Sequence, residues 1–252
     1  MFPVRDTIPS QTPPLMTWAL IGANCAVFLL ELAMPAEQLQ AMFYWFGVVP
    51  ARYTHPDWAV WLGLPVDNYW PFLTSMFLHG GWLHIISNMW TLWIFGDNVE
   101  DRMGPWRFLV FYLLCGVIAG VVHWVTNLHS TVPTIGASGA ISGVLGAYFL
   151  LYPRAHIITL IPLFFYPLFV ALPAATFALI WFFTQLFSGV TALLGPGQVG
   201  GVAWWAHIGG FIAGMALCKL FLDPNRRRRY KDEMTFESAW DVELVESKSK
   251  TD

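Results

Sequence analysis

Long apolar stretches alternate with short polar ones along most of the chain. A helix needs about 20 predominantly apolar residues to cross the hydrocarbon core of a bilayer. Five stretches approach that length and predict five membrane spans: 16–34, 81–97, 106–126, 136–152 and 204–222. The segment between the first two spans, residues 35–80, is rich in Trp, Pro and Gly. It predicts a long loop at the membrane interface, where aromatic side chains gather.

A further apolar stretch, residues 156–188, is interrupted by Pro162, Pro167 and Pro173, so its pattern alone allows one span or two. Charge decides between them, because positively charged residues gather on the cytoplasmic side of membrane proteins. A single span that begins near Pro173 places nearly all basic residues outside the spans, including Arg226–Arg229, on the side of both termini. The sequence therefore predicts an all-α membrane protein with six spans and both termini in the cytoplasm.

Composition excludes an ordinary soluble domain and a disordered chain. Of the 252 residues, 56% are hydrophobic and only 12% are charged, and the mean hydropathy is +0.54, whereas soluble domains carry about 25% charged residues. Seven of the 13 basic and eight of the 16 acidic residues lie in residues 223–252. We therefore expect three parts: a cytoplasmic N-terminal segment (1–14), a six-helix membrane domain (15–222) and a polar, disordered cytoplasmic tail (223–252).

Polar side chains inside the spans cluster near one surface of the membrane. Such groups are costly in lipid, so each of them needs an explanation. His84 and Asn88 are four residues apart, and hence on one face of the second span near its outer end. Ser138 lies in the first turn of the fourth span, and His207 lies in the first turn of the sixth. These spans run in the same direction, so the four side chains are predicted to lie at similar depth.

Two rows of small residues predict how the fourth and sixth spans pack. Small residues at four-residue spacing let helix backbones approach closely in lipid. The rows are Gly139, Gly143 and Ala147 in the fourth span, and Ala206, Gly210 and Gly214 in the sixth. If the rows face each other, Ser138 and His207 lie beside the contact.

A serine and a histidine at one depth indicate nucleophilic catalysis. A serine hydroxyl is a weak nucleophile unless a base takes its proton, and His207 can be that base. The unpaired N–H groups at the helix N-terminus beside Ser138 suit a developing oxyanion, and Asn88 and His84 can add side-chain donors. No Asp or Glu lies at this depth. The sequence therefore predicts a Ser–His dyad without a third carboxylate.

Three motifs resemble those of the rhomboid family of intramembrane serine proteases. They are Gly136-Ala137-Ser138-Gly139, the series His79, His84 and Asn88, and Ala206-His207-Ile208-Gly209-Gly210. Each lies at the outer end of its own span, and the resemblance covers residues 15–222. It implies a six-helix rhomboid-like bundle with a water-filled cavity open to the outside, and lateral substrate access near the second and fifth spans.

The resemblance also implies roles for these residues. Ser138 would be the nucleophile, His207 the general base, and His84 and Asn88 the oxyanion donors of an endopeptidase that cleaves in or next to transmembrane segments. The other motif residues are expected to be structural: His79, Gly136 and Gly139. The expected partners are transmembrane protein substrates and the lipid bilayer, with no nucleic acid and with no indication of oligomeric state.

Three further features bear on these expectations. The N-terminal Arg5-Asp6 and Pro9-Ser10 resemble a bacterial branch of the family, which implies a bacterial plasma membrane. Trp70-Pro71 stands where the family often has Trp-Arg, a difference that concerns loop structure. No cofactor or metal is expected. The cysteines have no metal-like spacing and are expected to be free, buried thiols: Cys25, Cys115 and Cys218.

The same residues allow other interpretations. Ser138 can be a helix-packing residue, and His84 and Asn88 can be hydrogen-bonding groups between helices. A rhomboid fold without catalysis would bind client membrane proteins. His84 and His207 could hold a haem, and the prolines of residues 156–173 are the one feature that favours a transporter. Three other histidines are expected to lie at membrane boundaries without a function: His123, His129 and His156.

Overall fold

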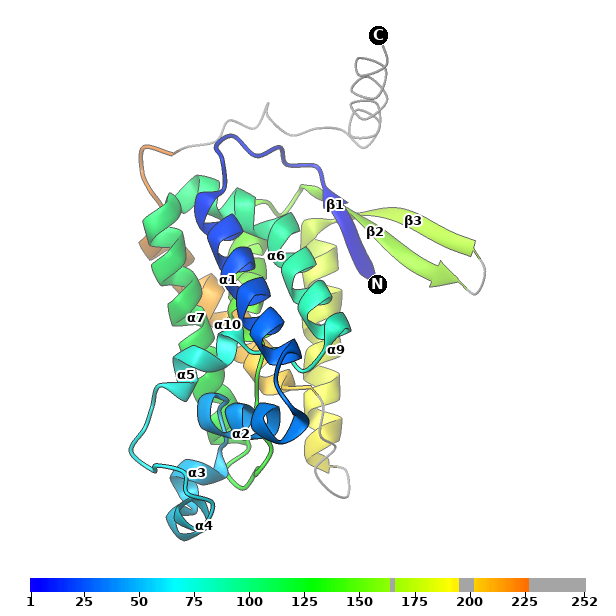
Figure 1. Cartoon of the computed structure of the whole chain (residues 1–252). Helices are drawn as coiled ribbons and strands as arrows, with labels where there is room; N and C mark the ends of the chain where they lie inside the picture. The colour runs from blue at the N-terminus through cyan, green and yellow to red at the C-terminus, as the bar shows by residue number, and fades with distance from the viewer. Residues whose placement is uncertain (164–165, 195–201, 227–252) are drawn as a thin grey trace.

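The computed structural model describes residues 1–163, 166–194 and 202–226 (Figure 1). Six long helices within these ranges form a bundle: α1 (Leu15–Leu32), α6 (Trp82–Met103), α7 (Pro105–Thr126), α8 (Ser138–Leu151), α9 (Ala174–Leu194) and α10 (Trp204–Phe221). Each helix overlaps one of the spans predicted from the sequence. The mostly helical architecture is therefore confirmed, and the predicted six-helix arrangement is compatible with it.

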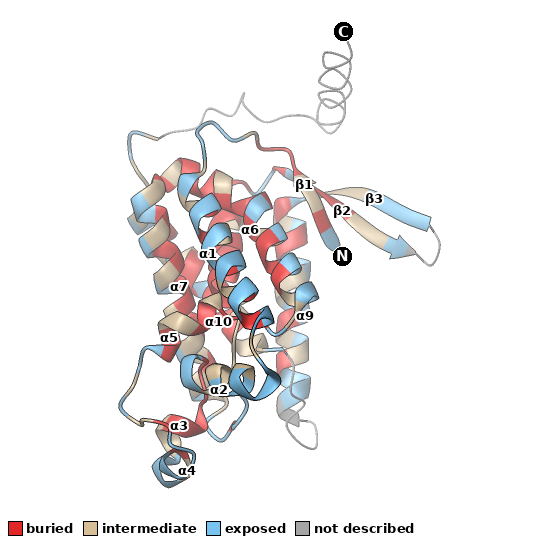
Figure 2. Cartoon of the chain, in the orientation of Figure 1, coloured by how far each residue is buried: buried red, intermediate tan, exposed pale blue. Residues whose placement is uncertain are grey.

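The six helices differ in how apolar they are. Within the described ranges, α1, α7, α9 and α10 are long and apolar enough to cross a membrane, as expected of a multi-pass membrane protein. Helix α6 is long, but it ends in charged residues such as Glu100 and Asp101. Helix α8 has only 14 residues, ten of which are buried, and it packs against α6, α7, α9 and α10. Figure 2 shows exposed positions on the outward faces of helices such as α1 and α7 and buried ones between the helices.

Glycine contacts bring α8 and α10 together. A Cβ atom on Gly210 would run into the carbonyl group of Gly139, and one on Gly214 would run into the carbonyl group of Gly143. The two rows of small residues therefore face each other, as the sequence predicted. Backbones in such close contact gain dispersion energy that larger side chains would prevent.

Short helices, rather than an irregular chain, make up the first loop. They are α2 (Ala36–Phe46), α3 (Ala51–Thr54), α4 (Pro56–Trp61), α5 (Pro71–Thr74) and the 3-10 turn η1 (Ser75–Phe77). Pro71 is the first residue of α5, where a missing N–H group costs little. The fully buried Arg52 of α3 donates hydrogen bonds to the carbonyl oxygens of Tyr44 and Trp45 at the end of α2. An arginine thus stabilises this loop, although Trp70-Pro71 lacks one.

A three-stranded antiparallel sheet lies beside the bundle, and the sequence analysis did not predict it. The strands are β1 (Phe2–Asp6), β2 (His156–Leu163) and β3 (Tyr166–Pro173), in the order β1-β2-β3. Strands β2 and β3 pair from His156 opposite Pro173 to Leu163 opposite Tyr166. The apolar pattern of residues 156–173 is compatible both with strands and with a segment that leads into a helix, so hydropathy alone does not distinguish the two. Helix α9 nevertheless begins directly after Pro173, close to the predicted start.

Two other expectations have different outcomes. Cys115 and Cys218 are buried free thiols, as predicted, but Cys25 is exposed. Cys25 lies on α1, a helix at the outside of the bundle that packs against α6 and α7 with one face and leaves its other face uncovered by protein. In a membrane that face meets lipid, so an apolar setting does not require burial in protein. Residues 227–252 of the predicted polar tail lie outside the described residues.

Charged side chains fasten the chain at the end of the bundle where α6 terminates, which we call the Glu100 end. The Glu100 carboxylate accepts hydrogen bonds from the N–H groups of Met16 and Thr17 at 2.9 and 2.8 Å and from the Thr17 hydroxyl at 2.9 Å. Asp101 accepts from the N–H groups of Gln11 and Thr12. The first N–H groups of a helix have no partner within it, so Glu100 caps α1.

Candidate active site

A serine and a histidine meet at the opposite end of the bundle, which we call the Ser138 end. Ser138 is the first residue of α8, and His207 lies in the first turn of α10. The Ser138 Oγ and His207 Nε2 atoms are 2.8 Å apart, which is a hydrogen-bond distance. The close glycine contact between α8 and α10 brings the two side chains together, although 69 positions separate them in the sequence.

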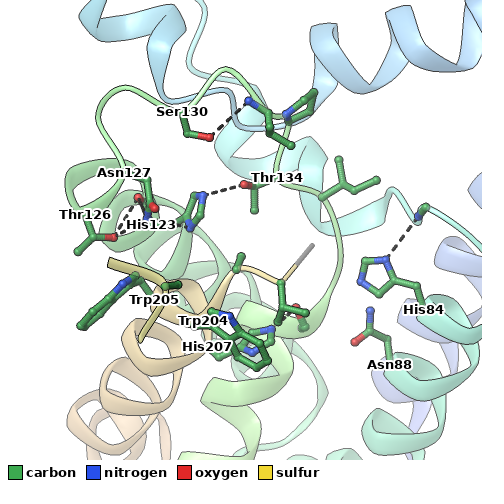
Figure 3. Close-up of a pocket in the computed structure, with 18 of the residues that line it drawn as sticks. His84, Asn88, His123, Thr126, Asn127, Ser130, Thr134, Trp204, Trp205 and His207 are labelled. Atoms are coloured by element: carbon green, nitrogen blue, oxygen red, sulfur yellow. Dashed lines mark hydrogen bonds between the residues drawn. The ribbon is translucent and has the colours of Figure 1, made fainter. Parts of the chain in front are cut away.

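A cavity of about 1180 Å³ opens beside this pair. Its walls come from α6, α7, the segment before α8, and α10, and they include the side chains of Ser138, His207, His84 and Asn88. His84 and Asn88 lie on the α6 side of the cavity, and His207 lies on the α10 side (Figure 3). All four candidate site residues therefore border one cavity that is large enough to hold water and part of a peptide.

Gly136 shapes the backbone between α6 and Ser138. Its φ of +121° lies in the region that favours glycine. A Cβ atom there would lie 2.6 Å from His84 Nε2 and 3.6 Å from Asn88 Nδ2. The chain just before Ser138 therefore passes directly against the two proposed oxyanion donors. Within the described residues, His84 Nδ1 accepts from the Gly80 N–H and Asn88 Nδ2 lies 3.0 Å from His79 Nε2, while both side chains line the cavity.

His79 connects the first loop to this region. Its backbone N–H donates to the Glu31 carboxylate of α1 at 3.1 Å, and its ring Nε2 lies 3.0 Å from Asn88 Nδ2. The ring is 1% exposed and packs edge-on against His84, with centroids 5.0 Å apart. His79 thus holds Asn88 in place rather than facing the cavity. Gly139 is a packing residue, because a Cβ atom on it would lie 2.7 Å from the Cβ of Ala119 in α7.

Comparison with known proteins assigns the family. The Rhomboid domain model matches residues 66–224, which include Ser138 and His207 and the two cavity residues of α6, His84 and Asn88. The chain belongs to the rhomboid family. Rhomboid protease GluP of Bacillus subtilis is 41% identical over 80 residues, which are 32% of this chain and 15% of GluP. YdcA of the same organism is 31% identical over 118 residues, or 44% of this chain and 57% of YdcA.

Relatives also occur in eukaryotes. The human mitochondrial presenilin-associated rhomboid-like protein is 35% identical over 97 residues, or 37% of this chain and 26% of that protein. The match thus spans between about one seventh and somewhat over half of the relatives' own lengths. Membership of the rhomboid family is shared with proteins named as proteases, and the catalytic status of this rhomboid rests on its own site.

The sequence analysis missed one polar residue in contact with His207. Gln185 lies on α9, and its Oε1 atom is 2.7 Å from His207 Nδ1. The signal was present, because Gln185 is a costly amide within an apolar span. It was overlooked because the search for a third group considered only Asp and Glu. The group in contact with His207 Nδ1 is the amide oxygen of Gln185.

Two histidines set aside in the sequence analysis also border the cavity. His123 of α7 is buried, and its Nε2 lies 2.8 Å from the hydroxyl oxygen of Thr134. His129 lies at the rim, where its Nδ1 is 2.9 Å from His55 Nε2. Figure 3 shows His123, Asn127 and Thr134 as a polar wall away from His207. These contacts tie the segment before Ser138 to α7 and to the first loop.

Metal and haem sites can be tested against the same geometry. Among the described residues, no group of three or more His, Cys, Asp or Glu side chains is placed to hold a metal ion. A haem bound between His84 and His207 would need a free ring nitrogen on each. Both nitrogens of His207 are already within hydrogen-bond distance of Ser138 and Gln185. Coordination of iron by either nitrogen would therefore break the contact that this nitrogen makes, with Ser138 at Nε2 or with Gln185 at Nδ1.

Proposed function

We propose that this rhomboid is an intramembrane serine endopeptidase that cleaves membrane proteins in or next to their transmembrane segments. The observation that carries the proposal is the 2.8 Å contact between Ser138 Oγ and His207 Nε2 at the wall of a cavity. A hydroxyl hydrogen-bonded to an imidazole nitrogen is the arrangement that activates a serine nucleophile. The named relatives that are proteases support the same reaction class.

The reaction begins when Ser138 Oγ attacks the scissile carbonyl carbon while His207 Nε2 takes the hydroxyl proton. The carbonyl oxygen becomes an oxyanion. The proposed hydrogen-bond donors to it are the backbone N–H at the start of α8 and the side chains of Asn88 and His84, which is supported by their position at the wall of the cavity. When the C–N bond breaks, His207 gives its proton to the departing amine nitrogen, which leaves an ester between the substrate acyl group and Ser138.

Water completes the cycle through the same cavity. A water molecule attacks the ester carbonyl as His207 Nε2 removes its proton. When the second tetrahedral intermediate collapses, the bond from carbon to Ser138 Oγ breaks and His207 returns the proton to Oγ, which leaves a carboxylic acid and free Ser138. In the proposed topology both termini are cytoplasmic, the Ser138 end lies near the outer surface of a bacterial plasma membrane, and the cavity opens to that surface. Transmembrane proteins are the substrate class, because the site lies among membrane-spanning helices.

The test is covalent labelling of the detergent-solubilised protein with a fluorescent fluorophosphonate. Ser138 Oγ would displace fluoride from phosphorus, and His207 would take the proton, so one fluorophore would attach per protein. Ser138→Ala and His207→Ala should reduce labelling by at least about 10³-fold, since a serine nucleophile and its base act as a unit. Ser142→Ala serves as the matched control, because Ser142 lies one turn along the same helix and is hydrogen-bonded to the Ser138 carbonyl oxygen.

Two results would overturn the proposal. A folded wild-type protein that does not label has no activated serine, and client binding without catalysis would then be the function to pursue. Labelling that persists in Ser138→Ala would place the nucleophile at another residue.

A further inference from the structure

Gln185 makes the second polar contact of the proposed base. Its amide lies on α9, its residue is 7% exposed, and its Oε1 atom is 2.7 Å from His207 Nδ1. The Trp181 ring, one turn earlier on α9, lies 6.0 Å from the His207 ring between centroids. One helix thus supplies both a polar and an aromatic neighbour to His207, and neither belongs to the motifs that identify the family here.

The hydrogen-bond pattern determines which way the Gln185 amide faces. The Thr184 hydroxyl donates to the Trp181 carbonyl oxygen at 2.6 Å, and its oxygen can then accept from Gln185 Nε2 at 3.3 Å. The amide NH₂ group therefore has a partner on α9. This leaves the amide oxygen to face His207. In the reversed orientation the amide oxygen would face the Thr184 oxygen, whose proton is already used.

This orientation selects one tautomer of His207. An amide oxygen only accepts hydrogen bonds, so His207 Nδ1 must carry the proton. In a neutral imidazole Nε2 then has a lone pair, which is the form that can accept the Ser138 proton. The opposite tautomer would place a proton on Nε2 and point it at Ser138 Oγ, and the serine would lose its base.

We propose that Gln185 is a positioning residue that holds His207 in the tautomer and orientation needed to activate Ser138. This role of Gln185 rests on the proposed function, because a base is needed only if Ser138 is a nucleophile. Gln185 takes the place that a carboxylate occupies in Ser-His-Asp triads, where the acid orients the imidazole and stabilises the imidazolium. An amide performs the first task and stabilises the cation only through its dipole. It thereby avoids placing an ionised carboxylate in the membrane.

The consequence concerns the chemical step rather than binding. Without an acceptor at residue 185, the imidazole would divide between tautomers and ring orientations, and only part of the population could take the Ser138 proton. Replacing the triad aspartate by an amide in serine proteases costs about 10⁴-fold through the wrong tautomer. Loss of a neutral acceptor should cost less, about 10- to 100-fold, because the amide of Gln185 carries no negative charge that stabilises the imidazolium.

The experiment measures fluorophosphonate inactivation of full-length protein and separates the limiting rate kinact from the reversible binding constant KI. Gln185→Leu removes the acceptor and keeps a side chain of similar length. Gln185→Glu keeps an acceptor oxygen. We expect Gln185→Leu to lower kinact about 10- to 100-fold with KI unchanged within about twofold, and Gln185→Glu to restore most of kinact.

A spectroscopic readout tests the tautomer directly. The ¹⁵N shifts of His207 in protein labelled at histidine should show a protonated Nδ1 in the wild type and a mixture in Gln185→Leu. Thr191→Val is the matched control. Thr191 lies on the same helix, is exposed, and bonds only with carbonyl oxygens of that helix, so its replacement should change neither readout.

The outcomes are distinct. A wild type that does not label overturns the proposed function. Labelling of Gln185→Leu at the wild-type kinact, in protein with the wild-type melting temperature, overturns the role of Gln185 alone. If Gln185→Leu does not fold, the ¹⁵N shifts and kinact of the isosteric Gln185→Glu decide the question, since a wild-type kinact with protonated Nε2 would contradict the proposal.

Discussion

Polar side chains gather at both ends of the helix bundle, but the two ends use them differently. At the Glu100 end, the carboxylates accept several hydrogen bonds from donors of the protein. Glu100 receives three hydrogen bonds from the start of α1, and Asp6 accepts from the Tyr148 hydroxyl at 2.6 Å and from Asn98 Nδ2 at 2.9 Å. At the Ser138 end, the described residues give Asn88 and His84 one side-chain hydrogen bond each, and both border a cavity of about 1180 Å³.

This difference separates stability from chemistry. A buried polar group that is fully paired holds elements together, and loss of its partner leaves a costly unpaired donor. A group that faces a cavity keeps its hydrogen-bonding capacity for a ligand or a transition state. Mutations at the Glu100 end should therefore lower the free energy of unfolding and spare the reaction. Mutations at the Ser138 end should slow the reaction and have a smaller effect on the free energy of unfolding.

Apart from replacement of Ser138 or His207 themselves, the largest effect is expected for Asn88→Ala at the Ser138 end. Loss of one oxyanion donor typically costs about 10²–10³-fold in turnover. We expect the rate constant of fluorophosphonate labelling to fall by that amount, and the melting temperature to fall modestly because the buried His79 ring loses its contact with Asn88. Ser87→Ala is the control, because Ser87 lines the same cavity but is hydrogen-bonded to its own helix at the His84 carbonyl. Unchanged labelling of Asn88→Ala would remove Asn88 from the oxyanion site.

Glu100→Leu should have the opposite signature. It leaves the Met16 and Thr17 N–H groups and the Thr17 hydroxyl without their acceptor. We expect the free energy of unfolding, measured by denaturant titration in micelles, to fall by about 2–3 kcal/mol. Glu37→Leu on the exposed surface of α2 should change it little. A loss of labelling in folded Glu100→Leu protein would show that the two ends are coupled.

Gly210→Ala lies between the two ends and should affect both properties. Its Cβ atom would run into the Gly139 carbonyl, so α10 would move away from α8 and carry His207 away from Ser138. Overpacking of this kind costs about 1–3 kcal/mol, and labelling should also slow. Gly22→Ala is the control, since a Cβ there meets nothing within 4 Å. Slower labelling without lost stability would place the effect on the contact between Ser138 and His207 alone.

The smallest effect is expected for Tyr148→Phe. It removes the hydroxyl that donates to Asp6 at 2.6 Å and should lower the free energy of unfolding by about 1 kcal/mol. Tyr112→Phe is a matched comparison, because the Tyr112 hydroxyl is buried without a hydrogen-bond partner in the described structure. Its removal should be neutral or stabilising. Equal losses in the two variants would show that the bond to Asp6 contributes nothing.

Several features of the fold and of the candidate site could be predicted from the sequence because they follow local patterns. Apolar length located the helices that cross the membrane, and four-residue spacing identified the rows of small residues that pack α8 against α10. The same spacing placed His84 and Asn88 on one helix face. Ser138 and His207 were selected as costly polar groups at one depth, and the structure brings them within 2.8 Å.

Other features depend on pairing between distant segments, which no local pattern encodes. Strand β1 pairs with β2 across about 150 residues, and the apolar run of residues 156–173 gave no sign that it would form a hairpin rather than lead into a helix. The buried Arg52 donates hydrogen bonds to the end of α2, and the pattern of the first loop gives no sign of this contact.

The sequence by itself therefore determined the apolar helices of the bundle, the facing rows of small residues on α8 and α10, and the candidate pair Ser138 and His207, because the cost of polar groups in lipid restricts where they can occur along a helix. Only the tertiary structure decided which group meets the other nitrogen of His207. That contact depends on the rotation of α9 about its own axis and on the direction of the Gln185 amide. Both are set by packing and hydrogen bonding against neighbouring helices, and an apolar sequence with scattered polar residues is compatible with several such rotations.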